Sequence, residues 1–600
     1  MSAWRARLLG VNLSDRSWDV AEIPREVLEG YLGGRGLGAR LLWEAERHLL
    51  DPFDPRSPLI LAAGPLTGTR APTASRTALT ALSPLTNTVF DANSGGFAGI
   101  RLKKAGYDAL WIEGASEEPL YLVVEPGAVR FEAAGDLWGR GNRATREALR
   151  AREGPGFAAL TVGPAGETGS LLANVAHDGR FFGRGGLGAL MGRKGLKAVL
   201  VAGDRPVEVA DPEGFGFVVR ECRKRLDAHP VTSQGLPAFG TAVLMNVIDA
   251  VGALPCGNFR EGRFPEAGAI SGEALADRLL VGRKACPGCP VGCGRRIRLG
   301  GDTVEGPEFE TLWALGANLG LGDLEAIARL NRLANDLGLD TISAGGTVAA
   351  ARELYEAGAW PWDPLDRGAQ GVAELLEGMA RASGRGEALR HGSRRLAEEA
   401  GRPEASMTSK GLELPAYDPR GAKGQGLAYA TSNRGGCHLR AYMVAPEILA
   451  TPKRIDRFAT SGKAGLTIVF QNLNAAVDSA VLCRFTSFAW KDDYYARLLR
   501  AATGLPLDGQ ELLRIGERIY TLERLINQRR GFTRADDTLP PRLLCEPLGS
   551  GPSAGHTVAL DAMLDEYFRF RGWDREGRPT AAKLAELGLA PEPSGAPPGG

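Results

Sequence analysis

The chain has 600 residues, which exceeds the size of a single hydrophobic core and predicts about two to four domains. Its apolar fraction of 44% and charged fraction of 24% are those of an ordinary soluble globular protein. A net charge of +1 gives no global field to hold nucleic acid or an anionic membrane. No segment approaches the ~20 apolar residues of a membrane span, and Asp15 and Asp19 interrupt any signal-peptide core. We expect a cytoplasmic protein without a nucleic-acid or membrane partner.

The first part of the chain, residues 1–208, has the pattern of a β-rich domain. Short apolar or alternating runs recur from "RLLGVNL" to "KAVLVAG", with turn residues between them. Pro126 and Gly127 in "VVEPGAVRF" predict a hairpin turn. Because no long helical pattern separates these runs, they predict antiparallel or mixed sheets.

Two further regions, 209–410 and 411–600, have mainly helical patterns. "DLEAIARLNRLANDLGLD" carries one apolar stripe, with Asp323 as its predicted N-cap and Gly338 as its stop. Segment 386–400 continues the helical pattern, whereas the tail "APEPSGAPPGG" is predicted to be disordered. The predicted fold is an α+β multidomain protein, a β-rich base followed by two mainly helical domains.

The most informative stretch is "CPGCPVGC", which places Cys286, Cys289 and Cys293 within eight residues. Its prolines exclude a regular helix, and its glycines let backbone N–H groups turn toward the sulfur atoms. A structural zinc ion fits, as does a [4Fe–4S] cluster with a distant fourth cysteine, and reduced core thiols are a third interpretation. The cluster is favoured because no second Cys/His pair follows within thirty residues.

Three glycine-rich loops have the composition of phosphate-binding segments. Gly183–Gly188 formally matches the dinucleotide fingerprint, but the match is weak because "HDGRFF" stands where a strand should end. Gly33–Leu42 and Asp91–Gly96 are similar in kind, and Asn93 offers an amide oxygen to Mg²⁺. Each loop alone is equally well explained as a tight turn. Together they favour a large anionic ligand.

These stretches, taken in order, resemble the tungsten-containing aldehyde:ferredoxin oxidoreductase family. The resemblance rests on "GGRGLGA", "GPLTGTRAPTASR", "NSGG", "GRGGLGALMG", the three-cysteine loop, "EGPEFETLWALGAN", "LGLDTIS", "NRGGCHLR" and "DSAVLC". It implies tungsten (or molybdenum) held by two pyranopterins between the β-rich base and the helices, with Mg²⁺ at their phosphates and a [4Fe–4S] cluster nearby.

The resemblance also implies site residues. Cys286, Cys289, Cys293 and Cys483 would bind the cluster, and Asn93 together with the backbone near Phe182 would bind Mg²⁺. A carboxylate can accept two hydrogen bonds from the paired N–H groups of a pterin. The resemblance implies this role for Asp340 and Asp478, with one pterin each. The implied cofactor-binding residues are Arg76, Asn93, Ser94, Gly95, Gly96, Phe182, Arg184, Gly185, Gly186, Asp340, Thr341, Arg440, Asp478 and Leu482.

The implied reaction is RCHO + H₂O → RCOOH with release of two electrons and two protons, and the electrons pass through the cluster to ferredoxin. His438 is the predicted group at the carbonyl, and Glu310 is the predicted base. Glu308, two residues earlier, would face the opposite way if that segment is extended. Cys437 stands where many relatives carry an acidic residue, and it is a rival fourth cluster ligand. The remaining five histidines are interpreted as structural: His48, His177, His229, His391 and His556.

Several alternatives stay open at this point. A relative with the same cofactor would act on formaldehyde, a sugar-phosphate aldehyde or an aromatic acyl-CoA. A non-catalytic zinc or cluster protein would keep the cysteine loop, and a nucleotide-dependent dehydrogenase would use NAD(P)⁺. The expected partners are a small aldehyde and ferredoxin. A homodimer or partner electron-transfer subunits are compatible with the sequence.

Overall fold

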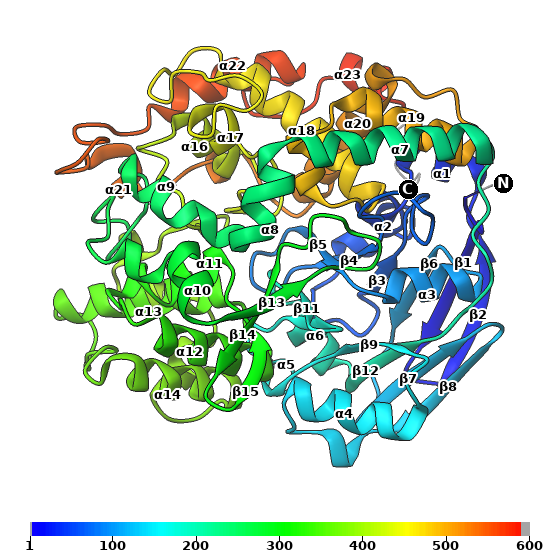
Figure 1. The fold of residues 1–600 in the computed structure, drawn as a ribbon, viewed down its shortest axis with the longest axis horizontal. Coiled ribbons are helices and arrows are strands. Elements are labelled where there is room, and N and C mark those ends of the chain that lie inside the picture. Colours follow the sequence, from blue (N-terminus) through cyan, green and yellow to red (C-terminus); the bar gives the residue numbers. More distant parts are fainter. Residues whose placement is uncertain (1–2, 590–600) are drawn as a thin grey trace, which may run out of the picture.

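A computed structural model describes residues 3–589 of the chain. Two sheets from the N-terminal part, blue to cyan in Figure 1, lie beside helices that come from the rest of the chain. The change falls between strand β12 (Leu196–Val201) and helix α7 (Pro212–Ala228). This arrangement confirms the predicted fold class, while the domain limits at 208 and 410 stay predictions. The C-terminal tail predicted to be disordered lies outside the described residues.

The first sheet is mixed, with strand order β2-β1-β6-β3-β4-β5. Strand β1 pairs with β6 in parallel, and the other neighbours pair antiparallel. Its inner strands are apolar and buried on both faces, as expected for a sheet covered on two sides. The strands are β1 (Arg7–Asn12), β2 (Ser17–Glu22), β3 (Leu59–Ala62), β4 (Arg76–Leu82), β5 (Val89–Gly95) and β6 (Ala109–Glu113).

The second sheet has the order β11-β10-β9-β12-β7-β8, in which β12 and β7 are parallel. The predicted hairpin at Pro126 and Gly127 is confirmed, because β7 and β8 pair antiparallel up to Glu125 and Ala128. A strand also ends directly before Gly183, contrary to expectation, but it belongs to an antiparallel hairpin and not to a βαβ unit. The strands are β7 (Leu120–Glu125), β8 (Ala128–Ala133), β9 (Ala158–Thr161), β10 (Val175–His177) and β11 (Arg180–Phe182).

The helical part packs directly onto the sheets, because one hydrophobic core includes Leu61 and Val199 of the sheets and Trp313 of the helices. Asp323 caps helix α12 through the backbone N–H groups of Glu325 and Ala326, as predicted. The helix predicted over 386–400 is divided, because Gly392 (φ 90°) separates a 3₁₀ turn from α15. The helices used below are α6 (Leu187–Arg193), α8 (Leu236–Phe239), α9 (Leu244–Ala250), α11 (Phe309–Ala314), α12 (Leu324–Leu337), α13 (Thr341–Glu356), α15 (Ser393–Glu399), α17 (Val444–Glu447), α18 (Lys463–Ser479) and α22 (Leu560–Arg571).

The three-cysteine loop is the tip of a small antiparallel hairpin between β13 (Leu280–Lys284) and β14 (Gly294–Leu299). Strand β15 (Asp302–Glu305) completes this sheet. The hairpin carries the cysteines to the N-terminal sheets, where the backbone N–H of Thr73 donates to the carbonyl oxygen of Gly288. Within residues 3–589, no helix combines the length and the apolar character needed to span a bilayer.

Candidate active site

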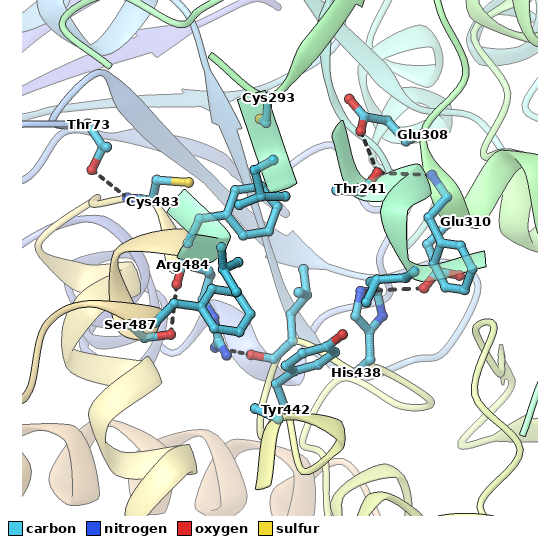
Figure 2. Close-up of a pocket in the computed structure, with 18 of the residues that line it drawn as sticks. Thr73, Thr241, Cys293, Glu308, Glu310, His438, Tyr442, Cys483, Arg484 and Ser487 are labelled. Atoms are coloured by element: carbon cyan, nitrogen blue, oxygen red, sulfur yellow. Dashed lines mark hydrogen bonds and ion pairs between the residues drawn. The ribbon is translucent and has the colours of Figure 1, made fainter. Parts of the chain in front are cut away.

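A cavity of about 1640 Å³ lies between the N-terminal sheets and the helices. Figure 2 shows Cys293 and Cys483 in one part of this cavity and Glu310 and His438 in another. The predicted site residues that line it are Arg76, Asn93, Ser94, Gly95, Cys286, Cys289, Cys293, Glu310, Asp340, Thr341, His438 and Cys483.

The four predicted cluster ligands all face this cavity, although Cys483 is far from the others in sequence. Gly95 at the end of β5 makes room for the loop, since a Cβ there would lie 2.6 Å from the Cys286 sulfur. On the other side, the backbone N–H of Cys483 donates to the Thr73 hydroxyl at 3.3 Å (Figure 2). The loop and Cys483 are thereby both anchored next to the segment that leads into β4.

The loop thiols are buried close to one another, so a bound cation would be needed to hold them as thiolates. Burial and the neighbouring Cys483 raise the pKa of Cys289 to about 11, and burial raises that of Cys293 as well. Four thiolates would repel one another here, and a cationic iron cluster would offset that repulsion. Among the described residues, no three His, Cys, Asp or Glu side chains converge closely enough to hold a single metal ion.

Arg76 joins the cysteine end to Asn93. Its Nε donates to the Asn93 side-chain oxygen at 2.8 Å, its Nη2 donates to the Asn93 carbonyl at 2.6 Å, and its Nη1 lies 4.0 Å from the Cys483 sulfur. The side-chain oxygen of Asn93 has a second lone pair, so this bond leaves it able to bind a hard cation.

Of the three predicted glycine-rich loops, only Gly183–Gly188 is a loop, and it leads into helix α6. Gly33–Leu42 forms most of helix α2 (Gly34–Glu44), and Asp91–Gly96 lies mainly in strand β5. Gly185 and Gly186 have φ of 85° and 71°, and Gly186 begins helix α6. A Cβ on Gly185 would lie 2.6 Å from the Phe90 ring, so only glycine fits. Phe182 is buried and stacks on His177, and Gly96 packs against the same histidine. These positions, Gly96, Phe182, Gly185 and Gly186, lie behind the cavity lining.

Asp340 has two partners in this structure. Its Oδ1 caps helix α13 by accepting from the backbone N–H of Ile342, and its Oδ2 accepts from the Nε of Arg184 at 3.1 Å. Arg184 is buried and also donates to the carbonyl oxygens of Gly436 (2.9 Å) and Glu413 (2.7 Å). The carboxylate is therefore a helix cap as well as a cavity-lining group. Thr341 follows it and also lines the cavity.

Asp478 occupies a buried network of alternating charges. It accepts from Arg440 at 2.9 Å and from Arg35 at 3.3 Å, and both arginines also pair with Asp91. Glu523 accepts from Arg35 at 2.6 Å and completes the network. Such a network satisfies each buried charge and fixes the carboxylate of Asp478 in place. Leu482, which follows in the chain, is fully buried behind the cavity lining.

Glu310 and His438 face each other across 3.6 Å between Oε1 and Nε2 (Figure 2). Burial raises the pKa of Glu310 to about 8. Burial, helped by Arg184 and Arg434, lowers the pKa of His438 well below its ordinary value. Glu310 Oε1 and His438 Nδ1 are buried and lack hydrogen-bond partners within the described part of the chain. Because such atoms cost free energy when unpaired, they indicate a polar ligand.

Glu308 and Glu310 have different partners, but the segment is the start of helix α11, so the extended conformation from which opposite facing was predicted is not present. Glu308 pairs with Arg180 at 3.1 Å and accepts from the Thr241 hydroxyl at 2.6 Å, whereas Glu310 accepts from the backbone N–H of Ala416 at 3.0 Å. Glu308 is thereby fixed on the sheet side of the cavity.

Several site residues carried no signal of their own in the sequence. Tyr417 and Tyr442 line the cavity beside His438, and their hydroxyls are 3.1 Å apart. Burial raises the pKa of Tyr417 well above its ordinary value, so both hydroxyls stay protonated. Asp91 in strand β5 and Arg35 in helix α2 belong to glycine-rich stretches that the sequence indicated, and only their position beside those glycines could have selected them.

Cys437 is buried behind His438 and does not line the cavity, unlike Cys483. This placement favours Cys483 over Cys437 as the fourth cluster ligand. Of the five histidines interpreted as structural, only His229 contributes to the cavity lining in the described residues.

The comparisons with known proteins agree with this geometry. Residues 8–203 match the sequence family described as "Aldehyde ferredoxin oxidoreductase, N-terminal domain", and residues 218–589 match its "domains 2 & 3". A tungsten-containing aldehyde ferredoxin oxidoreductase of Pyrococcus furiosus is 47% identical over 597 residues, covering 97% of this chain and 98% of the relative. The enzyme of the same name from Thermococcus kodakarensis is 45% identical, with coverages of 97% and 98%.

A solved structure is also similar. A chain of the active-site complex of a benzoyl-coenzyme A reductase, in complex with 1,5-dienoyl-CoA, superposes with a TM-score of 0.85 and 25% identity. The match covers 98% of this chain and 97% of that one. The two family matches together span both the sheets and the helices described above. The chain therefore belongs to the aldehyde ferredoxin oxidoreductase family and is an oxidoreductase.

Proposed function

We propose that this protein oxidises aldehydes to carboxylic acids at a tungsten (or molybdenum) bis-pyranopterin centre and delivers the electrons through a [4Fe–4S] cluster to ferredoxin. The observation that supports it most is that one cavity is lined both by four cysteines and by the Glu310–His438 pair. When bound, the metal accepts two electrons from the substrate and the cluster passes them on singly.

The chain has side chains that suit each part of this cofactor. The four cysteines would hold the cluster, Asn93 and the backbone of Phe182 would hold Mg²⁺, and Asp340 and Asp478 would each hold one pterin. The fixed arginine partners of both aspartates suit that role, since they hold the carboxylates in one orientation. Arg76 would lie between a pterin and the cluster, consistent with its contacts to Asn93 and Cys483.

Glu310 and His438 would manage the protons. Since Glu310 Oε2 accepts from the Ala416 N–H, its acidic proton belongs on Oε1, which faces His438 Nε2. Neutral His438 then carries its own proton on Nδ1 and would offer it as a hydrogen bond to the aldehyde oxygen, keeping the proton itself. When Glu310 has lost its Oε1 proton to solvent, its carboxylate would take a proton from the attacking water. Tyr417 and Tyr442 close this end of the cavity beside the histidine.

The walls of the cavity favour an apolar aldehyde over a phosphorylated sugar or a coenzyme A thioester. Apolar side chains of α8, α9, α17 and α18 line it, and Val247 and Val469 are both cavity-lining and 38% and 44% exposed, which places them at the mouth. Moving a hydrocarbon chain from water into such an apolar entrance is favourable, whereas moving a charged group into it costs free energy.

An anaerobic assay tests the proposal. The purified protein, prepared with tungstate, is offered acetaldehyde, an aromatic aldehyde, formaldehyde, glyceraldehyde 3-phosphate and an aromatic acyl-CoA, with ferredoxin, a viologen dye or NAD(P)⁺ as electron carrier. We expect oxidation of the unphosphorylated aldehydes with ferredoxin and viologen, and tungsten plus about four iron atoms per chain. Zinc alone, or activity with NAD(P)⁺ only, would contradict the proposal.

A further inference from the structure

The loop that carries His438 contains a buried sulfur that the reaction above does not use. Cys437 is 1% exposed, and its sulfur accepts hydrogen bonds from Arg434 Nη2 at 2.8 Å and from the backbone N–H of Leu439 at 3.3 Å. Among the described residues, no hydrogen bond donated by this sulfur is found. A sulfur that only accepts, and accepts from a guanidinium, has the bonding pattern of a thiolate.

Another buried cysteine of the same chain provides a contrast. Cys256 is 7% exposed, and its sulfur donates toward the carbonyl oxygen of Leu254 at 3.5 Å, as a neutral thiol does. Burial raises the pKa of Cys256, and no arginine offsets it. Burial alone would also raise the pKa of Cys437, but Arg434, Arg440 and Arg184 together lower it below its ordinary value.

The position of the sulfur links the two predicted pterin-binding carboxylates. Arg184 binds Asp340 and also the carbonyl oxygen of Gly436, directly before Cys437. Arg440, three residues after Cys437, binds Asp478. Six titratable groups interact electrostatically with the Cys437 sulfur: Arg184, Arg434, Arg440, Arg484, Glu310 and Tyr429.

We propose that Cys437 is a buried thiolate that positions the loop of His438, by acting as the anion that holds Arg434 and the Leu439 N–H on either side of the histidine. The role rests on the proposed function of His438. Cys437 acts through its neighbours and touches no substrate.

Infrared spectroscopy tests the ionisation state without relying on activity. Each neutral thiol of the anaerobic, cofactor-loaded protein contributes an S–H stretching band. The difference spectrum between wild type and Cys437→Ser should show no lost band, whereas Cys256→Ser, the matched buried control, should lose one. Loss of an equal band in Cys437→Ser would overturn the proposal, and this holds whether or not the protein oxidises aldehydes.

Steady-state kinetics test the positioning role. Cys437→Ser keeps the size of the side chain but removes its charge, so kcat should fall about tenfold or more with little change in KM. Cys437→Asp restores a negative acceptor and should recover most of kcat. If the sulfur merely packs, the buried aspartate would be the more damaging variant. A kcat for Cys437→Asp at or below that of Cys437→Ser, or an unchanged kcat for Cys437→Ser, would reject the role.

Discussion

Glu310 and His438 approach to 3.6 Å, yet burial moves their pKa values in opposite directions, and both become neutral near pH 7. This pair is therefore not an ion pair in the resting protein, although its atoms lie at ion-pair distance. A neutral carboxyl and a neutral imidazole at this distance can pass one proton between them, so either group can act as the acid or as the base. A reaction that releases protons requires such groups.

The pH dependence of the rate follows from that state. Because Glu310 must be ionised to accept a proton, kcat should rise with pH and level off above about pH 8, where burial places the pKa of Glu310. Glu310→Gln should lower kcat by about 10²–10⁴-fold and abolish this rise. Steady-state rates between pH 5.5 and 9.5, measured with a viologen whose reduction does not depend on pH, check the expectation. A profile that keeps its shape in Glu310→Gln would assign the base elsewhere.

The Glu310 carboxyl also makes the folded protein less stable as pH rises. Its folded pKa of about 8 lies above the ordinary value of 4.5, so folding favours the protonated form. The stability contribution is complete below pH 4.5 and is lost as pH rises to about 8. We therefore expect Glu310→Gln to melt at a higher temperature than wild type at pH 9 and at nearly the same temperature at pH 4.5. Scanning calorimetry at one fixed scan rate measures both; the reverse order would contradict the buried neutral state.

The fourth cluster ligand is tested by removing one thiol at a time. Cys483→Ala should lose most of the iron and the low-potential EPR signal of the cluster, because Cys483 faces the same cavity as the three loop cysteines. Cys437→Ala should keep both, since its sulfur is bound to Arg434 away from that cavity. Cys545→Ala, at an exposed thiol, is the control for general handling. The opposite pattern would make Cys437 the ligand.

The sequence predicted helix ends and turns well where they depend on residues close together in the chain. Asp323 and Gly338 fix the ends of α12 because a side-chain oxygen and a left-handed glycine act within one turn. The hairpin turn at Pro126 and Gly127 was equally local. The helix predicted over 386–400 was wrong in its middle because Gly392 adopts a positive φ, which periodicity alone does not reveal.

The site could be predicted only in part. Motifs placed Glu310 and His438 in one reaction, but their 3.6 Å approach depends on helix α11 meeting the 434–440 loop, a contact between distant segments. The resemblance implied only a cofactor-binding role for Asp340, whereas the structure shows that it caps α13 as well as lining the cavity. The partners of Arg184 could not be foreseen, since its four acceptors, which include the Ser343 hydroxyl, come from three separate segments.

Arg184 should not tolerate lysine. Its guanidinium donates to Asp340, Gly436 and Glu413 at once, and a single ammonium cannot reach all three acceptors in that fixed geometry. Arg184→Lys should lower the melting temperature and reduce pterin content, with a loss on the order of a few kcal/mol. Arg394→Lys is the matched control and should change neither, because Arg394 forms an ion pair with the exposed Glu398 and with no other described residue. Melting curves and quantified pterin per chain measure the two effects.

The apolar mouth of the cavity makes the final prediction. Val469 on α18 lines the cavity and is 44% exposed, so Val469→Glu would place a charge where the hydrocarbon chain of the substrate enters. We expect kcat/KM for a long-chain or aromatic aldehyde to fall on the order of tenfold, mainly through KM, with little change for acetaldehyde. Tyr355→Glu, at a 40% exposed position outside the cavity lining, should leave both substrates unaffected. An equal loss for acetaldehyde and the aromatic aldehyde would show that the substitution disturbs the fold rather than the entrance.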